Sequence, residues 1–241
     1  MADRTGEYIV TEGTDATGKT TVADLLAAMA YSEGHEVIRL DEPDSAYLYE
    51  PGNTNPEPLS PIASEIRKII KDGSLGRTAL TNVHLFTASR AENWKSVTWP
   101  ALQRGAWVIA ARNFLSTVAY QGYAEGFNPQ KIIDITNKAL GPQYMNPDHI
   151  NILDLENEEE RERRIAQRGQ LETRDTFESR DKDFQKRIIH GYHMIAQDYN
   201  IRIVSAAGTK QSVADGLWED IQKRIDSRPD IARTFSADWK F

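Results

Sequence analysis

The sequence predicts a doubly wound α/β domain, with a mostly parallel sheet of five strands and helices on both of its faces. Short β-prone runs alternate with helix-like runs along the chain, and this alternation is typical of parallel sheets. The run 106–111 is apolar throughout, as expected of a strand that is covered on both faces. At 241 residues, the chain is long enough for a domain with a sizeable core.

Residue periodicity and turn residues place the individual elements. We expect strands at 7–11, 36–40, 106–111, 149–155 and 201–204. We expect helices at 19–31, 78–103, 129–140, 157–168, 176–199 and 212–225, and one more that begins at Ser60 and Pro61. Ser60 is the expected N-cap of that helix, and Pro61 suits its first turn. The long helix should bend near Trp99 and Pro100.

No linker divides the chain, so we expect one domain at 1–226 and a C-terminal extension at 227–241. The extension carries Phe235, Trp239 and Phe241. These aromatic side chains either pack on the domain or contact a partner.

Composition narrows the functional classes. Without cysteine, the chain has no disulfide, thiolate-bound zinc or cysteine nucleophile, which fits a reducing cytoplasm. The net charge of −7 argues against a broad surface for nucleic-acid polymers. The chain has no apolar run long enough for a membrane span, and its N-terminus does not read as a signal peptide. We therefore expect a cytoplasmic protein that binds small molecules.

The clearest motif lies at residues 13–20, GTDATGKT, which match G-x-x-x-x-G-K-[ST] between an expected strand and an expected helix. Gly13 and Gly18 let the loop turn its N–H groups toward an anion at the helix N-terminus. Lys19 can reach the β- and γ-phosphates of ATP, and the Thr20 hydroxyl can bind Mg²⁺. The sequence therefore predicts a P-loop, with these ATP-binding residues: Gly13, Thr14, Asp15, Ala16, Thr17, Gly18, Lys19, Thr20 and Thr21.

The wider pattern resembles the thymidylate kinase family of P-loop nucleoside monophosphate kinases. Four segments in the family's order carry the resemblance, which spans roughly residues 8–225: EGTDATGKTT at 12–21, HLFTASRAE at 84–92, RNFLSTVAYQG at 112–122 and RIAQRGQLE at 164–172. It implies a P-loop NTPase fold, a mobile arginine-bearing lid at about 164–180, and transfer of the γ-phosphate of ATP to dTMP. It also implies a homodimer formed through helices beside the sheet.

The resemblance also implies the roles of particular residues. Phe86 would stack on the base, Arg90 and Thr117 would contact the base edge, and Tyr120 would lie against the deoxyribose. Asp15 would touch the acceptor sugar or phosphate. The acceptor site would comprise Glu42, Phe86, Arg90, Arg112, Ser116, Thr117, Tyr120 and Gln121. The catalytic residues would be Lys19, Arg112, Arg164, Arg168 and Asp15.

Taken singly, several of these residues have other interpretations. Phe86 could be a core aromatic, Arg90 a surface charge, and Arg112 a structural ion-pair partner at a strand end. Arg164, Arg168 and Arg174 could belong to a solvated charged segment. The resemblance makes these three arginines a lid that closes over the phosphates, with Gly169 interrupting the helix.

The sequence departs from the family pattern in three places. Ala111 replaces an Asp that helps to hold Mg²⁺, and Glu12, Asp15 or Glu42 could substitute for it. Asp41 replaces the first residue of an R-E-P turn, so one basic contact is lost. Ala16 replaces a P-loop glycine, and we expect a negative φ there.

These departures leave two other functions open. The chain could be a related P-loop kinase that acts on another deoxynucleotide or a deoxynucleoside. It could also be a weakly active nucleotide-binding regulatory protein, an interpretation favoured by Ala111.

Overall fold

The computed structural model describes residues 5–167 and 182–227. Its sheet has six strands, β1 (Tyr8–Gly13), β2 (Val37–Asp41), β3 (Tyr47–Leu48), β4 (Trp107–Ala111), β5 (His149–Asp154) and β6 (Arg202–Ser205). Their spatial order is β3-β2-β4-β1-β5-β6, and all neighbours are parallel except β2 and β3. The five predicted strands are confirmed. The two-residue antiparallel strand β3 was missed, because so short a strand has no readable alternation.

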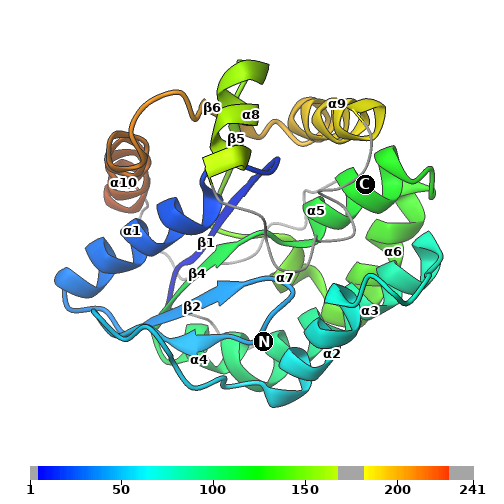
Figure 1. The fold of residues 1–241 in the computed structure, drawn as a ribbon. Helices are drawn as coiled ribbons and strands as arrows, with labels where there is room; N and C mark the ends of the chain where they lie inside the picture. Colours follow the sequence, from blue (N-terminus) through cyan, green and yellow to red (C-terminus); the bar gives the residue numbers. More distant parts are fainter. Residues whose placement is uncertain (1–4, 168–181, 228–241) are drawn as a thin grey trace.

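Helices cover both faces of the sheet (Figure 1). α1 (Lys19–Ser32) and α10 (Lys210–Asp226) lie on one side, where they bury a core that includes Ile9, Ile109 and Leu153. On the other side of the sheet lie α2 (Pro61–Lys71), α3 (Ala79–Asn93), α6 (Pro129–Leu140) and α9 (Lys182–Asp198) (Figure 1). On that side a second core gathers around Val10, Val108 and side chains of the other helices. This two-sided covering confirms the predicted doubly wound α/β class.

The other helices complete the chain. They are α4 (Trp99–Gln103), α5 (Phe114–Thr117), α7 (Pro142–Met145) and α8 (Glu158–Gln167), with π-helices η1 (Trp94–Thr98) and η2 (Val118–Ala124). The helix predicted at 129–140 is confirmed. Of the predicted helix 157–168, residues 158–167 are confirmed and residue 168 lies outside the described residues. Of the predicted helix 176–199, residues 182–198 are confirmed and 176–181 lie outside the described residues. No helix in the described ranges is both long and apolar enough to cross a bilayer.

Two local expectations were wrong in detail. The expected long helix 78–103 is three segments, and the change begins at Trp94, before Pro100. There the N–H of Trp99 donates to the carbonyl of Trp94, an i→i−5 bond that defines the π-helix. Ser60 does occupy the N-cap position of α2 and Pro61 its first turn, but the Ser60 side chain makes no capping hydrogen bond.

The strand register determines where the site can form. Thr11 of β1 pairs with Ala111 at the end of β4, and Ala111 pairs with Asp41 at the end of β2. The carboxyl ends of three parallel strands therefore meet in one row. In an open α/β sheet, ligands bind in the crevice outside these ends, where the strand order reverses.

Candidate active site

The loop between β1 and α1 depends on its two glycines. Gly13 has φ 137°, and a Cβ built there would lie 2.1 Å from the carbonyl oxygen of Leu153. Gly18 has φ 89°, and its Cβ would meet the side chain of Lys210 at 2.4 Å. Position 13 therefore requires glycine both for conformation and for space, whereas position 18 requires it for conformation, because the end of the Lys210 side chain can move.

Ala16 adopts φ 66°, so the expectation of a negative φ was wrong. The left-handed conformation costs an L-residue about 1–2 kcal/mol. The surrounding loop supports it, because the Thr17 hydroxyl donates to the carbonyl of Thr14 at 2.8 Å. The loop thus keeps a glycine-like conformation without glycine at this position.

Lys19 and Thr20 begin α1 at the mouth of a cavity. The Lys19 ammonium donates to the carbonyl of Thr14 at 2.5 Å and lies 3.8 Å from Asp15. The Thr20 hydroxyl donates to Asp41 at 3.3 Å. Five of the predicted ATP-binding residues line the cavity, namely Asp15, Gly18, Lys19, Thr20 and Thr21. The other four, Gly13, Thr14, Ala16 and Thr17, are buried and shape the loop behind them.

All eight predicted acceptor residues line this same cavity. They come from four separate parts of the chain: Glu42 after β2, Phe86 and Arg90 on α3, Arg112 after β4, and Ser116, Thr117, Tyr120 and Gln121 on α5 and η2. The fold therefore brings the expected donor and acceptor residues to one hollow at the carboxyl edge of the sheet.

Arg112 joins the P-loop to the acceptor side. Its side chain donates to Asp15 at 2.5 Å and to Ser116 at 3.2 Å, and its guanidinium lies 5.4 Å from the centre of the Tyr120 ring. Burial opposes the charge, but Tyr120 and Asp15 raise the pKa of Arg112 well above its usual value. Arg112 thus forms an ion pair with Asp15, as the alternative structural interpretation expected. Its side chain also lines the cavity and is 22% exposed.

Tyr120 contacts both members of this ion pair, Arg112 and Asp15. Its hydroxyl donates to Asp15 at 2.9 Å. Burial and then the Asp15 carboxylate raise the pKa of Tyr120, so it stays a neutral hydrogen-bond donor. Asp15 therefore accepts hydrogen bonds from two of the predicted acceptor-site residues, Arg112 and Tyr120.

Arg90 is buried, so the interpretation as a surface charge was wrong. It forms an ion pair with Glu42 at 2.6 Å and donates to the carbonyl of Asn113 at 2.9 Å. Tyr144 donates to the other Glu42 oxygen at 2.9 Å. Burial raises the pKa of Glu42, and the contact with Arg90 limits that rise. The Glu42 carboxylate thus holds the Arg90 guanidinium in place.

Several polar atoms at the deep end of the cavity have no protein partner among the described residues. They are Nη1 of Arg90, Oγ1 of Thr117, and both amide atoms of Gln121. Buried polar groups are nearly always hydrogen-bonded, so a cluster of exceptions that lines one cavity indicates a ligand. Phe86 lies beside them, half-buried, with its ring centre 5.6 Å from the guanidinium of Arg90. This end of the cavity combines an aromatic face with donors and acceptors, which suits a planar polar ring.

Glu12 supports the site from behind, and its role was not predicted. It accepts hydrogen bonds from the backbone N–H of Asn113 at 2.7 Å, from Ser116 Oγ at 2.7 Å and from Tyr192 at 2.9 Å. The Ser116 hydroxyl, predicted to bind substrate, is therefore already engaged by protein groups. Tyr192 and Tyr144 gave no signal because nothing near them in the sequence marks a site. Arg67 of α2 lines the cavity and was also missed.

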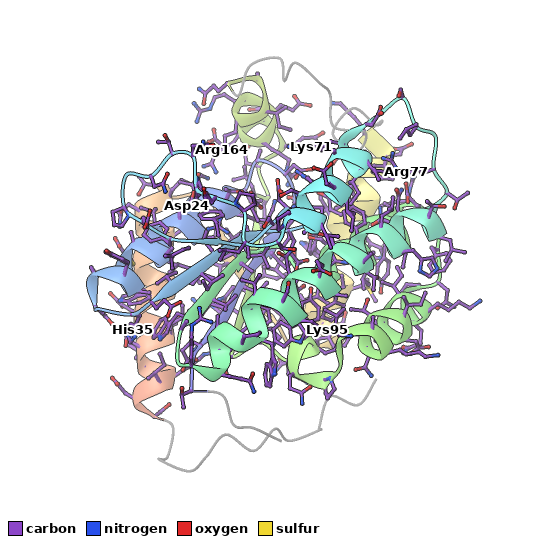
Figure 2. The ribbon with its side chains drawn as sticks, turned by 90° about the horizontal axis from the view of Figure 1, so that it is seen from below. Asp24, His35, Lys71, Arg77, Lys95 and Arg164 are labelled. Carbon is purple, nitrogen blue, oxygen red and sulfur yellow. The ribbon has the colours of Figure 1, made fainter. Side chains whose placement is uncertain are left out.

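The lid arginines are only partly described. Arg164 lies on α8 (Figure 2), where it pairs with Glu160 at 2.7 Å. It is not among the residues that line the cavity. Arg168 and Arg174 lie outside the described residues.

A P-loop that faces an arginine-lined cavity at the switch point of a parallel sheet is typical of P-loop nucleotide kinases. A family model for thymidylate kinase matches residues 46–216. The thymidylate kinase of Psychrobacter sp. is 31% identical over 223 residues, 91% of this chain and 99% of that protein. The corresponding protein of Exiguobacterium sibiricum is 30% identical over 227 residues, 93% and 98% of the two chains.

The chain therefore belongs to the thymidylate kinase family. Members of this family are ATP-dependent phosphotransferases, so the predicted family and enzyme class are confirmed. The crystal structure of a thymidylate kinase from Ehrlichia chaffeensis has the same fold, with a TM-score of 0.66 and 22% identity. The match covers 90% of this chain and 98% of the Ehrlichia chaffeensis chain.

Proposed function

We propose that this protein transfers the γ-phosphate of ATP to dTMP, giving dTDP and ADP. The observation that carries the proposal is the cluster of unpartnered polar atoms on Arg90, Thr117 and Gln121. The residues that carry these buried atoms line the same cavity as Lys19 and Arg112, which carry the charges that phosphates require.

The cavity suggests one orientation for the acceptor. The base lies against Phe86, with its edge toward Arg90, Thr117 and Gln121. The acceptor phosphate lies at the other end, beside Arg112. The deoxyribose lies between them against Tyr120, which disfavours a 2′-hydroxyl at that place.

The reaction needs positioning and charge neutralisation more than covalent help. An oxygen of the acceptor phosphate attacks the γ-phosphorus of ATP, and the bond from that phosphorus to the bridging oxygen of ADP breaks. The acceptor oxygen is ionised at neutral pH, so no strong general base is required. Lys19 stabilises the charge on the transferred group from the P-loop side. Arg112 does so from the acceptor side, because its contacts with Asp15 and Ser116 leave further N–H donors available.

The residues at the start of α1 fit a Mg²⁺ ion. Mg²⁺ prefers oxygen ligands and is usually held by one or two protein groups together with phosphates and water. Thr20 offers an exposed hydroxyl, and the oxygen of Asp41 lies 3.3 Å from it. When bound, the ion would neutralise charge on the β- and γ-phosphates.

The arginines at 164, 168 and 174 belong to the same proposal as a lid. Arg164 lies in the last turn of α8. Closure of the lid would bring these cations over the phosphates and exclude water.

A coupled assay of ADP formation tests the proposed activity. ATP and Mg²⁺ are supplied with dTMP, dUMP, dCMP, dGMP, UMP or thymidine, and with no acceptor as the blank. We expect dTMP to give the highest kcat/KM. A preference for thymidine or for another monophosphate would favour a related kinase. If no acceptor raises ADP above the blank, the chain is a binding protein and the proposed reaction is wrong.

We also propose a homodimer in the cytoplasm. Apolar side chains are exposed on and around α2 and at the start of α3, namely Leu59, Ile62, Ile69, Leu75 and Leu80. Exposed apolar groups gathered in this way favour protein contacts. Light scattering should give twice the chain mass of 27.2 kDa, and a mass equal to one chain would exclude the dimer.

A further inference from the structure

Four carboxylates lie on or next to the P-loop and at the end of β2, namely Glu12, Asp15, Asp41 and Glu42. The end of β4 offers none, because Ala111 is buried there with no polar side-chain atom. Asp24 and Asp44 also line a hollow beside Thr20, but Asp24 is engaged by Arg39, and Asp44 accepts from Ser45 and Ser64. If Thr20 binds Mg²⁺, as in the proposed function on which this inference rests, the four groups are the remaining candidates for a protein carboxylate at the metal. Their hydrogen bonds decide which of them is free to bind it.

Three of the four are already engaged by protein donors. Glu12 is buried and bound by Asn113, Ser116 and Tyr192. Asp15 receives hydrogen bonds from Arg112 and Tyr120. Withdrawing any of these carboxylates would leave buried donors without partners, which is unfavourable.

Glu42 is engaged in the same way. It is buried, and Arg90 and Tyr144 each donate to one of its two oxygens. The expectation that Glu12, Asp15 or Glu42 takes over a metal role is therefore not supported by their contacts.

Asp41 differs from the other three. Its side chain is only partly buried and lines the cavity. Within the described ranges, its one side-chain hydrogen bond comes from the hydroxyl of Thr20 at 3.3 Å. Asp41 is therefore the carboxylate of the four that can accept a metal or a metal-bound water without breaking a buried contact.

The strand register explains how Asp41 reaches this place. Asp41 and Ala111 are the last residues of two adjacent parallel strands and pair with each other. Side chains at paired positions point to the same face of a sheet, and Ala111 belongs to the core against α1. A carboxylate at the end of β2 therefore faces the start of α1, as one at the end of β4 would.

Arg39 holds the two sides of this contact together. It is fully buried on β2 and donates to the carbonyl of Thr20 at 3.2 Å and to Asp24 of α1 at 2.8 Å. The first turn of α1 is thereby tied to the strand that carries Asp41. The separation between Thr20 and Asp41 is thus set by buried structure.

We propose that Asp41 and Thr20 together hold the Mg²⁺ of the bound nucleotide, with Asp41 binding either the ion or its coordinated water. In this chain the metal carboxylate thus comes from the end of β2, because the end of β4 provides none.

The test measures ADP affinity by calorimetry in Mg²⁺ and, separately, in EDTA. Wild type should bind ADP more tightly with Mg²⁺. Asp41→Asn keeps the size of the side chain and removes its charge. We expect it to weaken binding in Mg²⁺ by about tenfold or more, the usual effect of losing a group that orients a metal ligand. In EDTA its affinity should equal or exceed that of wild type, because a negative charge near the phosphates has been removed.

Asp134→Asn on α6 is the matched control, since Asp134 is exposed and accepts only from Gln130 among the described residues. It should behave as wild type in both buffers. Asp41→Ala repeats the test with a side chain that has no oxygen, and thermal unfolding checks each variant. A second measurement follows free Mn²⁺ by its paramagnetic resonance signal in the presence of ADP and enzyme. The Asp41 variants should leave more Mn²⁺ free.

An equal ratio of affinities in Mg²⁺ and EDTA for wild type and Asp41→Asn would overturn the metal role of Asp41. If wild type binds no ADP in either buffer, the proposed function fails instead. The two failures are therefore distinguishable.

Discussion

The two ends of the cavity are built differently. At the base end, which we define as Phe86, Arg90, Thr117 and Gln121, several buried polar atoms have no partner among the described residues. At the phosphate end, which we define as Asp15, Lys19 and Arg112, the charged groups already contact one another or the loop. We therefore expect a ligand to satisfy open hydrogen bonds at the base end and to rearrange existing ones at the phosphate end.

This difference suggests that the base end selects the acceptor and that the phosphate end carries out the transfer. Unpartnered groups that are held rigidly discriminate strongly, since a wrong ligand leaves them unpaired. At the phosphate end the charges of Arg112 and Asp15 balance one another, and we expect phosphates to compete for Lys19 and Arg112. We expect variants at the base end to change acceptor affinity and variants at the phosphate end to change turnover.

The largest effect is expected from Lys19→Ala, which removes the cation that faces the transferred phosphate. Loss of one such group typically lowers kcat by about 10²–10³-fold. The midpoint of thermal unfolding should change little, because Lys19 donates mainly to one loop carbonyl. Lys68→Ala, at an exposed lysine of α2, is the control and should retain wild-type kcat.

Wild-type turnover in Lys19→Ala would remove the P-loop from the mechanism. A variant that keeps kcat and raises only the KM for dTMP would contradict the division between the two ends.

An intermediate effect is expected from Thr117→Val, which removes an unpartnered buried hydroxyl at nearly constant shape. The KM for dTMP should rise about tenfold, equivalent to one lost hydrogen bond of about 1.4 kcal/mol. The free energy of unfolding without ligand should stay the same or increase, because no protein hydrogen bond is broken. Urea unfolding and steady-state kinetics measure the two quantities.

Thr136→Val on α6 is the matched control for that variant. Its buried hydroxyl donates to the carbonyl of Ile132 at 2.8 Å, so it should lose up to about 1 kcal/mol of stability with no change in KM. If Thr117→Val loses stability in the same way and keeps its KM, the Thr117 hydroxyl is structural.

The smallest effect is expected from Ala16→Gly. Glycine adopts φ 66° without the steric cost that alanine bears, so the folded state should gain up to about 1 kcal/mol. Part of that gain is offset by the greater freedom of glycine in the unfolded chain. Ala23→Gly, in the interior of α1, should instead destabilise by about 1 kcal/mol. Equal destabilisation of both variants in urea would contradict the left-handed conformation of Ala16.

Most of the fold was predictable because its signals are local. Five strands and most helices follow from hydrophobic periodicity and turn residues, which each segment carries by itself. The π-helix at 94–98 was not predictable, because its i→i−5 register depends on packing as well as on Pro100. The positive φ of Ala16 was missed for a similar reason, since the surrounding loop overrides the preference of the residue.

The motifs also predicted which residues gather at the cavity, whereas the contacts among those residues were not predictable. All eight acceptor residues line one cavity with the P-loop. Nothing in the sequence indicates that Glu42 pairs with Arg90, or that Tyr192 reaches Glu12 across 180 positions. Motifs name residues that touch ligands, and the groups that support them are chosen by packing.

The sequence alone determined the P-loop, the order of strands and helices along the chain, and the residues available to meet a nucleotide. These depend on short-range backbone preferences and on spacing within single segments. Only the tertiary structure decided which carboxylate stands beside Thr20. That choice depends on the order and register of strands in the sheet, where Asp41 becomes the neighbour of Ala111. Contacts between distant strands are settled by the packing of the whole domain, which no single segment encodes.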